Sequence, residues 1–112
     1  MQGNALIDVR VRQQVGDSVA DYRYDTPLML VYVNDGLREI WRQHAEAFYG
    51  SSVIVEYPGD LSSLTEELPI GDNFINALMH FVCHRIHLQN AEDANNREKS
   101  AMHYDLFMRA MA

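Results

Sequence analysis

The hydrophobic pattern along the chain is strongest after Thr26-Pro27, where a capping residue is followed by proline at a first helical position. From there, apolar and aromatic side chains recur at spacings of three and four, at Leu30, Val33, Leu37, Ile40 or Trp41, His44 and Phe48. Most of the polar side chains fall on the opposite side. This periodicity predicts a long amphipathic helix that runs to Tyr49 and is stopped by Gly50.

A shorter helix is predicted before it, over residues 4–15. Asn4 is a suitable N-cap, and Ile7, Val11 and Val15 follow one another at four-residue spacing. Residues 9–12 also alternate between apolar and charged side chains, so a strand is the alternative there. We favour the helix.

Two more helices are predicted in the second half of the chain. Residues 73–89 follow Asp72, a suitable N-cap, and carry apolar side chains on nearly every face, which is typical of a helix in the centre of a bundle. Asp93 can cap a last helix. Its apolar positions at helical spacing are Ala94, Ala101, Tyr104, Met108 and Met111, with Phe107 beside them.

The segment between the second and third helices differs in character. Ser52 to Tyr57 is rich in β-branched and aromatic residues and ends at Pro58-Gly59, so it predicts a strand and a turn. The return run, Leu61 to Leu68, is a poorer strand. The expected fold is therefore all-α, a single domain over residues 1–112 built as a small bundle of about four helices with a short β excursion.

We expect residues 50–70 to project from this bundle and to contact a neighbouring subunit, because an exposed strand edge invites pairing with another chain. The alternative is that the segment folds back over its own helices and buries Ile54 against Leu64. Val53, Val55 and Tyr57 would share one face of the strand and are the candidates for contacts between subunits.

Composition and charge narrow the function. The 112 residues are 47% hydrophobic and 22% charged, enough apolar material for one packed core, and the net charge is −7. This charge argues against a protein dedicated to gripping nucleic acid, which needs clustered Lys and Arg. The one cysteine, Cys83, cannot form an intramolecular disulfide. We expect no secretory signal at the start of the sequence. We also expect no membrane span, because the longest uncharged apolar stretch, between Asp72 and Arg85, is too short to cross a bilayer.

The negative charge is concentrated in the middle of the chain. No Lys or Arg lies between Arg42 and Arg85, while that stretch holds Glu46, Glu56, Asp60, Glu66, Glu67 and Asp72. One region of the molecule is therefore expected to be strongly negative.

Candidate chemistry is sparse. His80, His84 and His87 have helical spacing that could bring them to one zinc ion. However, Phe81 stands where a zinc-protease motif has its general-base Glu, and no acid falls between Asp72 and Glu92. We therefore expect histidines with ordinary structural partners, no metal, no cofactor and no catalytic site, and we keep a small metal-binding or protein-binding regulatory module as the rival of another class.

Two segments together resemble a known family. Val33-Asn34-Asp35-Gly36-Leu37-Arg38-Glu39-Ile40 is similar to the Leu-Asn-Asp-Ala…Glu-Ile core of small head-to-tail connector, or portal adaptor, proteins of tailed bacteriophages. Leu68-Pro69 before an apolar helix, then Ala91 to Asn95, then Tyr104 and Phe107, are similar to the end of those proteins. The middle segment is shorter than the extended β excursion of such adaptors.

The resemblance implies a virion structural protein rather than an enzyme. Such a protein forms a dodecameric ring beneath the portal, extends the DNA channel and offers a surface for tail attachment. The implied partners are other copies of the chain, the portal protein, neck or tail proteins, and DNA that passes without sequence-specific binding. The implied location is the neck of the virion, after assembly in the host cytoplasm. If DNA passes through the ring, some of the acids from Glu46 to Asp72 would face the channel and repel phosphates; the alternative is that they only keep the free subunit soluble. A neck or tail-completion ring is the nearest alternative.

Overall fold

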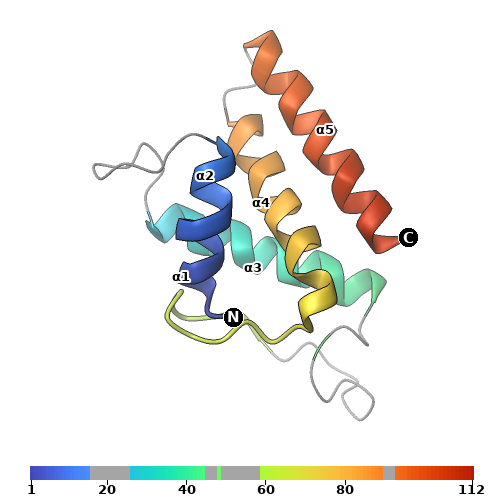
Figure 1. The fold of residues 1–112 in the computed structure, drawn as a ribbon. Helices are drawn as coiled ribbons and strands as arrows, with labels where there is room; N and C mark the ends of the chain where they lie inside the picture. Colours follow the sequence, from blue (N-terminus) through green and yellow to red (C-terminus); the bar gives the residue numbers. More distant parts are fainter. Residues whose placement is uncertain (16–25, 45–47, 49–58, 90–92) are drawn as a thin grey trace.

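The residues that the structure describes form four helical segments around one hydrophobic core (Figure 1). A computed structural model describes residues 1–15, 26–44, 48, 59–89 and 93–112. Of these residues, 77% are helical, which confirms the all-α class. Their β pairing is limited to two isolated bridges, Gln2 with Glu67 and Phe48 with Ile70.

The N-terminal segment is helical, so the strand alternative for residues 9–12 is wrong. Three short elements run on from one another, namely α1 (Gly3–Ala5), a π-helical turn η1 (Leu6–Val11) and α2 (Arg12–Val15). The apolar side chains of η1 are buried. Asn4 lies inside the helix, where its backbone N–H donates to the Leu64 carbonyl at 2.7 Å, and Gln2 takes the N-cap position.

The central helix α3 (Thr26–Gln43) begins where the sequence predicts but ends before Tyr49. Its last hydrogen bond runs from the His44 N–H to the Ile40 carbonyl, at 2.7 Å. Phe48, expected on the helix face, is buried instead in the bridge with Ile70, and its ring meets Trp41 edge-on with the centroids 5.3 Å apart. Phe48 thus packs against a distant segment instead of continuing the apolar face of the helix.

The buried helix follows a 3₁₀ turn. η4 (Asp72–Phe74) leads into α4 (Ile75–Leu88), and neither element begins with a side-chain cap. The prediction that Asp72 caps this helix is therefore wrong. Helix α3 and the N-terminal helical segment pack against α4, and α5 lies along its other side (Figure 1). This central place explains the apolar residues found all round α4, as the sequence indicated.

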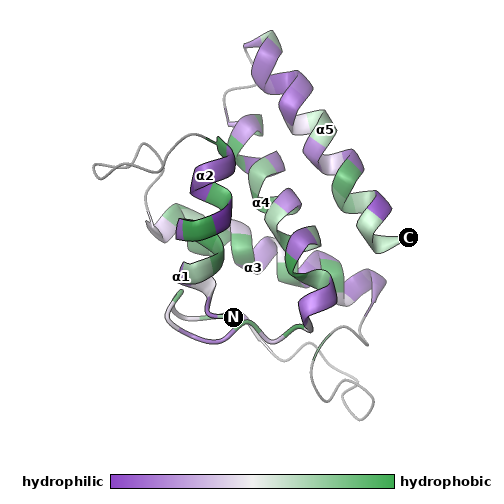
Figure 2. Cartoon of the chain, viewed as in Figure 1, coloured by the Kyte–Doolittle hydropathy of each residue, from purple (hydrophilic) through white to green (hydrophobic). Residues whose placement is uncertain are grey.

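The last helix, α5 (Ala94–Met111), is capped by Asp93, whose Oδ1 accepts from the Asn95 N–H at 2.8 Å, as predicted. Its buried face differs from the expected one. The residues that it buries are Ser100, His103, Phe107 and Met111, whereas Ala101, Tyr104 and Met108 are exposed. The first half of α5 is mostly hydrophilic (Figure 2), and its contact with α4 is partly polar, so the apolar spacing did not identify it.

Residues 59–71 cross the end of the bundle at which the N-terminus of the chain lies (Figure 1). The expected return strand from Leu61 to Leu68 is not a strand, because its backbone bonds to the chain terminus rather than to a hairpin partner. The Gly3 N–H donates to the Glu66 carbonyl at 3.1 Å, and the Leu68 N–H donates to the Met1 carbonyl at 2.8 Å. Leu64, Leu68 and Ile70 are buried in the core. This part of segment 50–70 therefore packs on its own chain, while the strand predicted from Ser52 to Tyr57 lies outside the described residues.

Candidate functional site

The segment that resembles the adaptor family forms the middle of α3. Val33, Leu37 and Ile40 are fully buried. Gly36 lies so close to α4 that a Cβ atom there would come within 2.6 Å of Leu78 Cδ1 and 2.9 Å of Phe81 Cδ1. A small residue at this position lets the two helices approach each other.

The polar residues of the same segment attach α3 to its neighbours. Asn34 Nδ2 donates to the Leu61 carbonyl at 3.0 Å, and Asn34 Oδ1 accepts from the Leu61 N–H at 2.8 Å. The Arg38 guanidinium holds both Asp60 carboxylate oxygens, at 2.9 and 2.6 Å.

Asp35 of the same segment forms an ion pair with Arg85 of α4 at 3.3 Å. The Arg85 guanidinium also lies 5.1 Å from the centroid of the Phe81 ring. The polar half of the segment thus has internal partners that account for its residue types.

Four of the six acids expected to line a channel lie among the described residues. Asp60, Glu66, Glu67 and Asp72 are all exposed, on the segment that crosses the N-terminal end of the bundle. Glu46 and Glu56 lie outside the described residues, as do the contact candidates Val53, Val55 and Tyr57.

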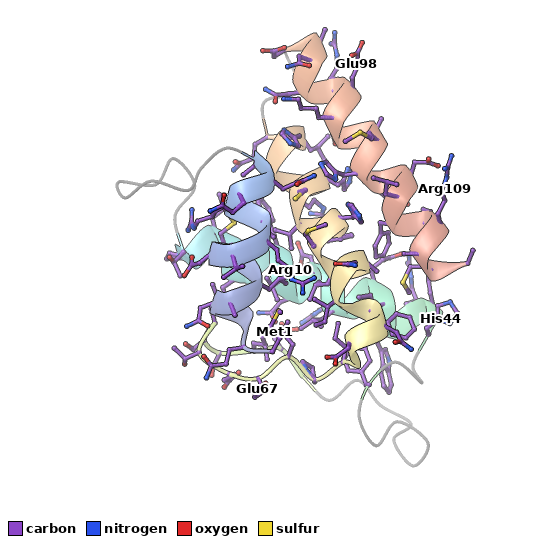
Figure 3. All side chains as sticks on the ribbon, in the orientation of Figure 1. Met1, Arg10, His44, Glu67, Glu98 and Arg109 are labelled. Carbon is purple, nitrogen blue, oxygen red and sulfur yellow. The ribbon has the colours of Figure 1, made fainter. Side chains whose placement is uncertain are left out.

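Two of these exposed acids have partners on the chain: Glu67 pairs with the N-terminal amino group, and Glu66 bonds to Ser62. Glu67 Oε2 lies 3.0 Å from the Met1 amino group, and both residues lie at one end of the molecule, far from Glu98 (Figure 3). Glu66 accepts from the Ser62 N–H at 3.1 Å and from its hydroxyl at 2.8 Å. We call the end that carries Asp60, Glu66, Glu67 and Asp72 the acidic end; there, Asp60 is paired with Arg38 and Glu67 with the terminal amino group.

The five histidines of the chain all belong to α5 or contact it. His103 lies on α5, and three others reach α5 from α4. The fifth, His44, lies after the end of α3, near the C-terminal end of α5 (Figure 3). Its Nε2 donates to the Met111 carbonyl. The sequence had indicated the three histidines of α4 but missed His103, although its spacing from Ser100, Phe107 and Met111 is that of one helix face.

His103 is the centre of this group, and it is only 2% exposed. Its Nδ1 lies 3.1 Å from Nδ1 of His80, and its ring stacks on His87 with an interplanar angle of 6° and a centroid separation of 5.7 Å. Burial first, and then positive charge at the neighbouring histidines and Lys99, lowers the pKa of His103 to about 4. Burial also lowers the pKa of His80. His103 is therefore neutral at pH 7.

The other two histidines of α4 donate to polar groups of α5. His84 Nδ1 lies 2.8 Å from the Ser100 hydroxyl and 3.1 Å from the Ser100 carbonyl. His87 Nδ1 lies 3.2 Å from Asn96 Oδ1. Burial lowers the pKa of both rings, although these hydrogen bonds partly oppose the shift. We call His80, His84, His87 and His103 the histidine cluster.

The chemistry open to these residues is limited. Within the described part of the chain, no three His, Cys, Asp or Glu side chains are placed to hold a metal ion. Cys83 is fully buried, and burial raises the pKa of its thiol to about 12, so it remains protonated at neutral pH and is no nucleophile. Among the described helices, none is long and apolar enough to cross a membrane.

Comparisons with protein-family models, with curated proteins and with solved structures found no match to this chain. The described part of the chain combines three features, namely a packed α3 segment with its polar anchors, an acidic end and a buried histidine cluster.

Proposed function

We propose that the chain is a non-enzymatic virion protein, a head-to-tail connector that forms a dodecameric ring beneath the portal of a tailed bacteriophage. The observation that carries the proposal is the place of the family-like segment in the fold. Its apolar residues build the centre of the core, and Asn34, Asp35 and Arg38 join α3 to α4 and to residues 59–71. A motif that packs in this way supports a helical fold shared with the adaptor family. The proposed function itself is taken from the resemblance to that family.

The surface charge suits the proposed role. In a ring that surrounds a DNA channel, carboxylates facing the lumen repel phosphates and let the duplex slide, whereas Lys and Arg would hold it back. Asp60, Glu66, Glu67 and Asp72 are exposed at one end of the subunit and are the candidates for that lining. Glu46 and Glu56 remain candidates by their sequence position alone.

Contacts between neighbouring subunits are proposed for Val53, Val55 and Tyr57. Residues 61–70 cannot supply an isolated projecting arm, because they pack on the N-terminal end of their own chain. The proposed contact is therefore restricted to the part of the excursion before Pro58.

The deciding experiment is assembly with a portal protein encoded by the same genome. The full chain is mixed with purified portal rings, and the mass of the complex is measured under native conditions. One copy of the 12.9 kDa chain per portal subunit is the expected result. The matched variant replaces Val53, Val55 and Tyr57 with serine and should keep its helix content by circular dichroism but fail to join the complex.

Other outcomes separate the alternatives. A ring that binds isolated tail proteins but not the portal would favour a neck or tail-completion protein. A monomer that ignores both and gains mass with zinc would reject the connector and favour the metal-binding class.

A further inference from the structure

The contact between α5 and α4 is polar at its centre, whereas most contacts between helices in a protein core are apolar. His103 meets His80 through one hydrogen bond and His87 through a parallel stack. Toward the C-terminus, the main apolar contact is Phe107, whose ring meets Phe81 edge-on at 5.2 Å. From this arrangement we infer that α5 is a pH-sensitive latch, docked on α4 at neutral pH and released in mildly acidic solution while the rest of the chain stays folded. The inference is independent of the proposed ring.

The His80–His103 hydrogen bond sets a limit on the number of protons. The two Nδ1 atoms, 3.1 Å apart, share one hydrogen, so one ring donates and the other accepts. One further proton on an outer nitrogen leaves this bond intact. When both rings become imidazolium, both Nδ1 atoms carry hydrogen, the bond is lost, and two positive charges face each other.

Among the described residues, no carboxylate contributes to the pKa of any histidine in the cluster. The charged groups that act on the cluster are Arg85 from α4, on His84, and Lys99 from α5, on His87 and His103. Both are cations. Tyr104 contributes a ring contact with His84, at a centroid distance of 4.9 Å.

Two described carboxylates on the adjoining elements are paired with arginines. Asp105 of α5 pairs with Arg109 at 3.0 Å, and Asp35 of α3 pairs with Arg85. From the N-terminal helical segment, Arg10 meets α4 through Asn76 at 2.8 Å. Each added proton therefore increases repulsion within the contact between α4 and α5.

The remaining histidine contacts tolerate protonation, which places the sensitivity at His103. His84 and His87 donate through Nδ1 to oxygen atoms of α5, and His44 donates through Nε2 to the Met111 carbonyl. An imidazolium ring still donates through either nitrogen. These three bonds survive acidification, while the contact at His103 does not.

Release of α5 rather than general unfolding follows from the packing. Helix α5 packs chiefly on α4, whereas α4 is also held by α3 and by the N-terminal helical segment. Loss of the α5 contact leaves that second set of contacts in place. Helices held on one side are the elements that open locally at the lowest free energy.

Hydrogen exchange on the full chain tests the latch at about pH 7.5 and about pH 5, with rates corrected for the intrinsic effect of pH. The expected result is a loss of protection of about tenfold or more in α5, with α3 changed by less than about threefold. His103→Asn keeps a hydrogen-bonding group near the Nδ1 position but cannot be protonated, so its α5 should keep its protection at pH 5. His44→Gln, the matched control, should behave as the wild type.

Three results would overturn the inference. One is equal loss of protection in α3 and α5, another is no loss in α5, and the third is a His103→Asn protein as sensitive as the wild type. If His103→Asn does not fold, His80→Asn provides the same comparison. In the wild type, the loss of α5 protection should begin as the pH falls below about 6.5, before the His103 ring of the docked helix titrates, because the released ring binds a proton that the docked ring does not. The isoelectric point is about 5.0, and His103→Asn and His44→Gln each remove one histidine, so a change of net charge cannot produce a difference between these two variants.

Discussion

Asn34 and Leu61 exchange two hydrogen bonds, from the Asn34 amide to the Leu61 carbonyl and from the Leu61 N–H back to the Asn34 amide oxygen. One side chain of α3 thereby satisfies both backbone groups of a residue in a segment without regular structure. This pairing fixes the start of residues 61–70, which then bury Leu64, Leu68 and Ile70.

Asn34→Ala should therefore lower the free energy of unfolding by about 1–3 kcal/mol, the range for leaving partly buried hydrogen-bonding groups without a partner. Urea denaturation measures it. Arg109→Gln is the control, because it removes an exposed pair with Asp105 that contributes at most about 0.5 kcal/mol. Equal effects of the two substitutions would show that the Asn34 bonds do not hold the segment.

Gly36→Ala should destabilise the protein although alanine is the better helix former. The gain in helix propensity is about 1 kcal/mol. Against it, the new methyl group would meet Leu78 and Phe81 at less than 3 Å in a filled core, and such overpacking costs about 1–3 kcal/mol. We expect a net loss of about 1 kcal/mol by chemical denaturation.

The loss should be smaller when Leu78 is shortened. In a Leu78→Ala background the nearest obstructing atom is absent and only the contact with Phe81 remains, so Gly36→Ala should be less destabilising than in the wild type. A double-mutant cycle measures this coupling. Additive effects would mean that the approach of α3 to α4 does not depend on Gly36.

The stability of the chain should fall as the pH is lowered from about 6.5 to about 4. The pKa of His103 is lowered from an ordinary value of 6.5 to about 4, so within this range the unfolded chain binds a proton that the folded chain does not. The stability difference is fully present above pH 6.5 and is lost on acidification to about pH 4, to a total of about 3.5 kcal/mol, since one pKa unit corresponds to about 1.4 kcal/mol. Denaturation curves at successive pH values measure it, and His103→Asn should flatten this dependence.

Cys83 should be inert toward thiol reagents in the native protein. Burial raises the pKa of its thiol to about 12, so thiolate is scarce at pH 8, and the side chain has no exposed surface. Reaction with a disulfide reagent should proceed only as fast as the chain opens, and adding denaturant should accelerate it. Immediate modification at the rate of a free thiol would contradict the burial of this part of α4.

The helices could be predicted because their periodicity and end signals are local. Asp93, for example, caps α5 as its position indicated. The end of α3 could not be predicted, because Phe48 is held by its bridge to the distant Ile70. The course of residues 61–70 likewise depends on pairing with Met1 and Gly3, which no local pattern contains.

The histidine cluster shows a second limit. A search for apolar spacing selects Tyr104 and Met108, yet α5 buries Ser100 and His103, because the facing surface of α4 presents imidazole rings. Helix faces that match through polar groups have no hydrophobic signature. His103 could have been found only by asking which residues of α5 suit the histidines of α4.

The last prediction rests on the proposed function and concerns charge at the acidic end. If Glu67 and Asp72 line a DNA channel, the double variant Glu67→Gln, Asp72→Asn removes phosphate repulsion there, and DNA should leave assembled particles more slowly. Glu98→Gln with Asp105→Asn makes the same change of charge in α5, whose Glu98 lies at the opposite end of the molecule (Figure 3). Ejection rates of particles carrying each variant provide the measurement, with urea denaturation to verify equal stability. Slowing by the first pair alone is expected. If both pairs slow ejection equally, net charge rather than a lumen lining is responsible, and if neither does, these acids serve only the surface of the subunit.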